Sequence, residues 1–242
     1  MNKKRISLVL LLVVTIFAVS ACDAVNVTGS GDMITETRQV NNFDNIDLSG
    51  QGKVIVTQSG SESLSIETDD NVMEHLKIEV EGGTLKIGFD EGLRIIDPTQ
   101  LTFYVGVDNL TGLNLSGSGD IQAETLETSR LELKVSGSGN VSVADLQASE
   151  VAAEISGSGE IHLDGDVPDQ DVDISGSGKY LAGDLCSASV SVSVSGSGNA
   201  TVCATEKLSA DVSGSGSIDY YGRPVVDISE SGSGDVNSLG EK

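Results

Sequence analysis

The chain has 242 residues and a formal net charge of −23; 38% of the residues are hydrophobic, 3% are aromatic, and there is no tryptophan. So acidic a protein is unsuited to bind nucleic acid or an anionic lipid surface, because the phosphates would be repelled. The scarcity of aromatic residues disfavours a large globular core and favours narrow stacks of aliphatic side chains, so we expect a single elongated domain.

The first 22 residues have the features of a secretion signal. A basic start at 3–5 precedes an apolar run over 6–19, which is too short for a spanning helix and leads through small residues into Cys22. This pattern resembles a bacterial lipoprotein signal with its lipobox, whereas the alternative is an ordinary signal peptide that ends near a cysteine. The resemblance implies removal of 1–21, which carries three basic and no acidic residues and so leaves a net charge of −26. It also implies lipidation of Cys22 and an exported protein anchored by lipid to the bacterial cell membrane or envelope.

Residues 22–40 are expected to form the lipidated tether and the lead into the domain, and residues 41–110 the N-terminal β part of the fold. Within that part, segment 43–54 is a degenerate copy of the repeat that fills the rest of the chain, with Gln51 in place of a serine. The pattern then predicts, in order, one helical turn over 69–76, a hairpin over 76–87 and a strand over 101–107. We expect this irregular part to cap one end of the repeats, because an open end would expose strand edges and core.

Residues 111–242 are built around a repeated Ser-Gly-Ser-Gly motif. Successive copies are 18–20 residues apart, and a period near twenty is typical of structural units that stack and bury each other's apolar edges. The seven copies begin at Ser116, Ser136, Ser156, Ser175, Ser195, Ser213 and Ser231.

One repeat, over 131–143, shows how each copy of the motif is oriented. Apolar residues alternate with polar ones from Leu131 to Val143, and the alternation passes through the motif without a break, so the glycines share the buried parity and the serines the exposed one. A flexible Gly/Ser linker would not keep this phase, and an antiparallel meander would need a reversal after every strand. The sequence therefore predicts an all-β parallel β-helix, a solenoid with about 18–20 residues per coil.

The order of these segments resembles a known family, the auto-transporter adhesin head domain, or GIN domain, of bacterial surface and envelope proteins. The resemblance covers residues 29–236 and implies a pectin-lyase-like, right-handed β-helix with an adhesin-like role. It is carried, besides the repeats, by Gly29-Ser30-Gly31-Asp32, Arg38, Phe43, Ile46-Asp47-Leu48-Ser49-Gly50, Asp69-Asp70-Asn71-Val72 and Gly83-Thr84-Leu85-Lys86-Ile87.

Stacked coils would align the residue after each motif beside two columns of serine hydroxyls. This candidate polar binding stripe would bind a glycan or a divalent cation; the alternative is a solvated face whose serines bond each other and water. We favour the solvated face over a specific cation site, because Lys179 interrupts the column and calcium needs several converging oxygens. The stripe comprises Ser116, Ser118, Asp120, Ser136, Ser138, Asn140, Ser156, Ser158 and Glu160.

No catalytic constellation is visible in the sequence. Acidic residues are scattered, His75 and His162 are far apart, and we assign no catalytic residue, metal ligand or cofactor. We expect a surface-tethered, non-catalytic adhesin-like or structural interaction module of the bacterial envelope, with the membrane as its partner through the lipid anchor and a glycan or surface protein as ligand. The alternative is a β-helical carbohydrate-active enzyme, a polysaccharide lyase or hydrolase, which would need paired carboxylates in one cleft.

Two cysteines test the register of the repeats. Cys186 lies nine residues before the motif at Ser195, and Cys203 lies ten before the motif at Ser213. Stacking would bring their Cα atoms to about 5–6 Å, inside the disulfide range, and export would let a disulfide persist. The alternative is two small buried thiols in one core stack.

Overall fold

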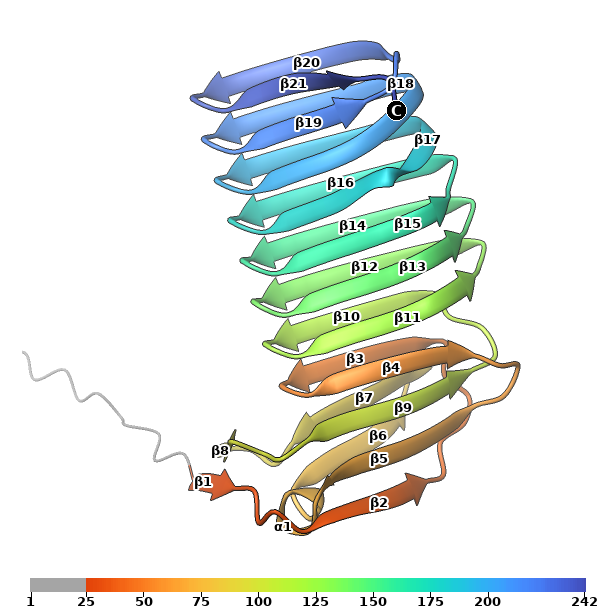
Figure 1. Cartoon of the computed structure of the whole chain (residues 1–242), viewed down its shortest axis with the longest axis vertical. Helices are drawn as coiled ribbons and strands as arrows, with labels where there is room; N and C mark the ends of the chain where they lie inside the picture. The colour runs from red at the N-terminus through yellow and green to blue at the C-terminus, as the bar shows by residue number, and fades with distance from the viewer. Residues whose placement is uncertain (1–24) are drawn as a thin grey trace, which may run out of the picture.

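The computed structural model describes residues 25–242, so Cys22 and its predicted lipidation lie outside the described residues. Figure 1 shows an elongated stack of β-coils with an irregular N-terminal end. The elements of the N-terminal part are β1 (Val25–Thr28), β2 (Met33–Arg38), β3 (Asn45–Gly50), β4 (Lys53–Gln58), β5 (Ser63–Asp69), α1 (Asp70–Met73), β6 (Leu76–Glu81), β7 (Thr84–Phe89), β8 (Leu93–Ile96) and β9 (Leu101–Val107).

The repeats form the strands of the upper stack, and each Ser-Gly-Ser-Gly motif joins two of them. These strands are β10 (Gly112–Gly117), β11 (Asp120–Glu127), β12 (Arg130–Gly137), β13 (Asn140–Gln147), β14 (Glu150–Gly157), β15 (Glu160–Asp166), β16 (Asp169–Gly176), β17 (Lys179–Gly196), β18 (Asn199–Gly214), β19 (Ser217–Tyr221), β20 (Val225–Gly232) and β21 (Asp235–Gly240).

Successive coils stack in parallel and in register, which confirms the predicted parallel β-helix. On the face before each bend, Leu115 pairs with Val135 and Val135 with Ile155. On the face after it, β11 pairs with β13 and β13 with β15. In Figure 1, β11, β13 and β15 lie in front and run to the right, whereas β10, β12 and β14 lie behind and run to the left as the chain climbs, so the winding is right-handed.

A shift of the buried positions marks a second corner in the coils of β11 and β13. In β11, Ile121 and Ala123 are buried, and the next buried residue is Leu126 rather than residue 125. The two-residue alternation of a strand therefore slips by one position, and the chain turns there into a short third side. The same slip recurs in β13 between Val143 and Leu146.

Glycine is required at the Ser-Gly-Ser-Gly bend for two different reasons. Gly137 has φ +139°, a backbone conformation that side chains rarely adopt, and a methyl group there would overlap the carbonyl oxygen of Gly117 in the coil below. A methyl group on Gly139 would overlap the carbonyl oxygen of Gly119 and the side chain of Leu115. The predicted buried parity holds for the second glycine of the motif, since Gly139 is buried, whereas the first glycine of each motif is half-buried or exposed. Backbone stacks directly on backbone at this corner.

The N-terminal part forms the predicted degenerate coil and end cap, but its coils are stacked in an order that differs from their order in the sequence. The β3–β4 coil is in register with β10 and β11 on one side and with β7 and β9 on the other. Below it, β6 pairs antiparallel with β7, while β2 and β9 flank β5 in antiparallel pairs. The predicted hairpin, helical turn and strand are all present, as β6–β7, α1 and β9.

The core of the repeats is a narrow column of aliphatic side chains that also contains a buried polar network. The Tyr180 hydroxyl donates a hydrogen bond to Gln170 Oε1 (2.7 Å), and Gln170 Nε2 donates to Ser187 Oγ (2.6 Å). Burial raises the pKa of Tyr180, so the phenol stays protonated and remains a donor. Buried polar groups need such partners, which explains how these three residues sit among aliphatic neighbours.

Candidate functional site

The stack aligns the predicted polar stripe as a straight ladder along the bends. Ser116, Ser136 and Ser156 are partners in register, and so are Asp120, Asn140 and Glu160. Neighbouring coils are about 4.8 Å apart, so each column presents a side chain at that interval along the solenoid. The second serines of the motifs, Ser118, Ser138 and Ser158, lie on the bend between these columns and are exposed.

Most hydroxyls of the stripe are free to meet a ligand or water. Within residues 25–242, the serine–serine hydrogen bond of the stripe joins Ser116 to Ser49 (3.1 Å), and the hydroxyls of Ser136 and Ser156 have no protein partner. In the outer column, Asn140 Nδ2 donates to Asp120 Oδ1 (2.8 Å). The stripe is therefore mostly a row of exposed hydroxyls rather than a closed hydrogen-bonded network.

The N-terminal end of the stripe opens into a polar cleft. Residues 97–102 pass beside the first two bends and leave a cleft of about 590 Å³. Asp97 has φ +45°, an uncommon conformation for a residue with a side chain, at the rim of this cleft. The cleft is lined by Gln51, Gly52, Lys53, Asp97, Pro98, Gln100, Leu101, Thr102, Ser118 and Asp120.

An apolar groove of about 360 Å³ adjoins the polar cleft on the other side of the same bends. Gln51 and Ser118 line both spaces, so the stripe meets polar surface on one side and apolar surface on the other. Its apolar wall consists of Phe89, Leu93 and Ile95, and Arg94 is its one charged lining residue. Such a combination of hydroxyls, an amide and an apolar wall suits a ligand with both polar and apolar faces.

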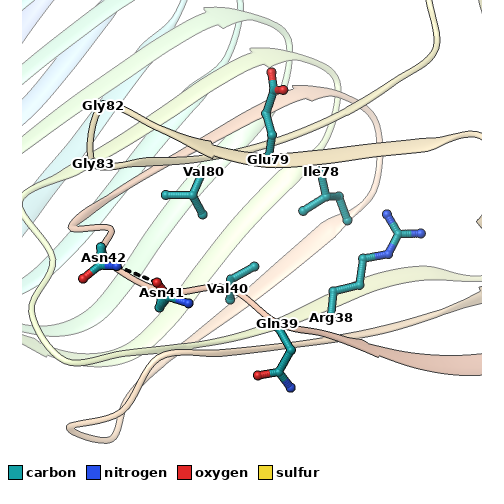
Figure 2. A pocket seen from close by; sticks show the side chains of 10 residues that line it. All are labelled: Arg38, Gln39, Val40, Asn41, Asn42, Ile78, Glu79, Val80, Gly82 and Gly83. Atoms are coloured by element: carbon teal, nitrogen blue, oxygen red, sulfur yellow. Dashed lines mark hydrogen bonds between the residues drawn. The ribbon is translucent and has the colours of Figure 1, made fainter.

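A separate groove of about 510 Å³ lies between residues 38–42 and the β6–β7 hairpin (Figure 2). Its centre is apolar, because Val40 and Val80 face one another there, and the Glu79 side chain points away. The Arg38 guanidinium is engaged in the fold: it donates to the carbonyl oxygens of Leu76 (3.1 Å) and Met73 (3.4 Å). This groove therefore lacks the converging polar groups of a reactive site.

The described part of the chain offers no metal centre and no paired histidines. Within residues 25–242, no three His, Cys, Asp or Glu side chains are grouped closely enough to hold a metal ion. His75 and His162 each lie near a single carboxylate, that of Asp90 (3.5 Å) and Asp164 (3.7 Å), in different parts of the stack. Within the same residues, no helix has the length and apolar character needed to cross a membrane.

Cys186 and Cys203 are partners in register on adjacent coils. Their Cα atoms are 4.4 Å apart and their sulfur atoms are bonded in the structure. The register prediction is confirmed, because the two residues are paired and 4.4 Å lies at the short end of the disulfide range. The two residues do not share one core stack, since Cys203 is buried and Cys186 is exposed.

Sequence reasoning missed the residues that line the two spaces at the end of the stripe. Residues 90–100 have no repeat motif, and β8 pairs in parallel with β1, far away in the sequence. The signals available were Pro98, which marks a turn, and the apolar run of Leu93, Ile95 and Ile96 in an otherwise irregular stretch. Neither signal could place this segment against the first two bends.

Comparison with solved structures gives the same architecture. A crystal structure titled as a putative adhesin from Bacteroides fragilis has a TM-score of 0.84 and 29% sequence identity, over 88% of this chain and all of that one. A "putative lipid binding protein" from Parabacteroides distasonis has a TM-score of 0.74 and 27% identity, over 88% of this chain and 99% of that one. A putative adhesin from the same species has a TM-score of 0.73 and 28% identity, over 88% of this chain and all of that one.

No curated protein matches the chain. The profile of one protein family matches residues 42–224, which spans the cap from β3 onward, including the degenerate coil, and the repeats up to the last two strands. The chain therefore belongs to the family described as "Putative auto-transporter adhesin, head GIN domain".

Proposed function

We propose that the protein is a surface-tethered, non-catalytic adhesin-like module that binds a glycan along the polar stripe. The observation that carries the proposal is the register of the stripe, which aligns one exposed serine column with an outer column of carboxylate and amide groups. A ligand that itself repeats, such as a polysaccharide, would meet a serine hydroxyl at every coil, beside an outer column that changes from Asp120 to Asn140 to Glu160. The lipid on Cys22 would hold this surface at the bacterial membrane or envelope.

The end of the stripe supplies the features that a plain solvated face would lack. Sugar rings have hydroxyl groups on their edges and apolar C–H faces, and the bends carry hydroxyls beside the apolar wall of Phe89, Leu93 and Ile95. Gln51 and Ser118, which line both spaces, are placed to hold a chain end there. Since the whole surface is strongly acidic, we propose a neutral or cationic glycan rather than a polyanionic one.

The binding test replaces the outer column of the stripe in three consecutive coils. In the variant Asp120→Lys, Asn140→Lys, Glu160→Lys, long side chains would cover the bends and remove the polar groups. Binding to a panel of immobilised neutral, cationic and anionic oligosaccharides is measured by surface plasmon resonance. We expect at least a tenfold loss of affinity for the glycan that the unaltered chain binds.

The structure offers a control with the same change in charge on a different column. Glu132, Ala152 and Asp171 are in register on three consecutive coils and lie on the outer face before the bend. The variant Glu132→Lys, Ala152→Lys, Asp171→Lys should keep the affinity. An equal loss of affinity in both variants would contradict glycan binding at the stripe. So would a failure of the unaltered chain to bind any oligosaccharide of the panel.

One observation favours the alternative class, a carbohydrate-active enzyme. Asp97 and Asp120 line the same cleft together with Lys53, which gives two carboxylates and a basic residue in one place. If this cleft cleaves a glycan, Asp120→Asn abolishes the cleavage, measured as reducing ends or unsaturated products, while Asp227→Asn on the last coil leaves it unchanged. An adhesin-like module shows no cleavage in either protein.

A further inference from the structure

One column of the core ends in a charged residue. Seven aliphatic side chains, each at most 2% exposed, occupy the position before the bend in successive coils, and they pair in register from one coil to the next. The eighth position of the column is Glu230, the partner of Val212. The seven are Leu48, Leu115, Val135, Ile155, Ile174, Val194 and Val212.

Glu230 is exposed at the open end of the stack, but its side chain points across that end rather than to the outer face. Its Oε1 atom accepts a hydrogen bond from the backbone N–H of Val236 (3.1 Å). Glu230 lies on β20 and Val236 on β21, the two sides of the same coil, so the carboxylate reaches across the end of the stack. An N–H group that a further coil would use as a donor is therefore already bound.

The coil that Glu230 crosses is the exposed end of the described stack. Within residues 25–242, β20 pairs with β18 and β21 pairs with β19, and the opposite edge of each strand has no partner. Val225, Ile228 and Leu239 of this coil are 78%, 47% and 45% exposed. Unpaired edges with apolar side chains are templates for pairing with another chain, which soluble proteins block with charges that point inward.

We propose that the Glu230 carboxylate prevents this end of the solenoid from stacking on a second copy of the chain. A second copy is the fitting occupant, because its end coil has the same strand lengths and the same row of aliphatic side chains. Stacking two such ends would bring the two Glu230 carboxylates into one core and strip them of water. Because an unpaired buried charge is strongly destabilising, the contact is excluded.

The test is the variant Glu230→Val, which continues the aliphatic column. It is made in a Cys22→Ala background, so that no lipid is attached, and studied by sedimentation velocity over a wide range of concentration. High salt screens the repulsion between these acidic chains. We expect the parent to stay monomeric and the weight-average mass of Glu230→Val to rise towards twice the monomer mass.

Asp227 provides the matched control. It lies on the same strand, three residues away, and is exposed on the outer face, in register with Ser209. Asp227→Val likewise removes one carboxylate and introduces valine but leaves Glu230 in place, so it should remain monomeric. Circular dichroism and thermal unfolding establish that each variant is folded.

A second measurement keeps the proposal testable if Glu230→Val does not fold. Glu230→Gln keeps an acceptor for the Val236 N–H but removes the charge, so it should self-associate more than the parent while the Val236 amide stays protected from hydrogen exchange. Folded Glu230→Val that stays monomeric at every concentration would overturn the proposal. So would self-association of Asp227→Val to the same extent, or a parent that already pairs through β20.

Discussion

At the residue scale, the fold depends most on the glycines of the bends. Gly137 combines a positive φ with direct contact to the backbone of the next coil. Gly137→Ala should lower the free energy of unfolding by about 1–3 kcal/mol from backbone strain alone, and by more because of the overlap. Urea unfolding followed by circular dichroism measures the change. Ser138→Ala, one residue away and exposed, should change it by less than about 0.5 kcal/mol.

A second residue, Asp69, fixes the N-terminal segment to the cap. Its carboxylate is buried and accepts hydrogen bonds from the backbone N–H of Gly31 (2.7 Å) and from the N–H (2.8 Å) and hydroxyl (2.9 Å) of Thr99. Burial alone would raise the pKa of Asp69, but these donors outweigh it and lower the pKa below its ordinary value of 3.8.

A lowered pKa makes the stability contributed by Asp69 depend on pH. The contribution is fully present above the unfolded pKa and is lost as the pH falls through the lower folded value. Between about pH 7 and about pH 2–3, the free energy of unfolding measured in urea should therefore fall more for the parent than for Asp69→Asn. The variant should also be less stable at neutral pH and expose residues 28–32 to proteolysis. A parent and variant with parallel pH profiles would contradict this role.

At the element scale, Cys186 and Cys203 join β17 to β18 at a place where the ladder is irregular. Three residues of β17, 183–185, are inserted there relative to β18. The disulfide closes a loop of 17 residues, for which chain entropy predicts about 3 kcal/mol of stabilisation.

We predict that the exported protein is oxidised at this pair. Intact mass after alkylation should show no free thiol at either residue until a reductant is added. The double variant Cys186→Ser, Cys203→Ser should unfold at lower urea concentration than the parent, and reductant should then have no further effect on it. Alkylation of both residues without reductant would disprove the bond but not the register.

At the scale of the whole molecule, the acidic solenoid needs a tether to remain at a membrane. We predict that the mature chain begins at an acylated Cys22 and partitions with membranes and into detergent. Cys22→Ala should become soluble, whereas Cys203→Ser should stay with the membrane. Membrane fractionation and the mass of the N-terminal peptide measure both points. A mature chain with unmodified Cys22 would contradict the lipid anchor.

The sequence alone determined the parts of the fold that repeat. Each coil carries its own alternation and its own glycines, and the Ser-Gly-Ser-Gly phase sets which side chains face inward, so the register of Asp120 with Asn140 follows from local pattern. Counting residues back from the following motif likewise predicted that Cys186 lies beside Cys203. These features were predictable because neighbouring coils in the stack are also neighbours in the sequence.

The tertiary structure decided everything that depends on contacts out of sequence order. The coil that contains β7 and β9 lies below β3–β4, although it follows that coil in the chain. Nothing in the alternation of residues 84–107 distinguishes that position from one above. Asp97 and Asp120 line one cleft, and the Glu230 carboxylate accepts a hydrogen bond from Val236. Both arrangements likewise depend on how segments fold across the ends of the stack. At the ends of the stack the repeat stops, so the local sequence pattern no longer specifies which strand lies next to which. There the packing of the side chains decides the pairing.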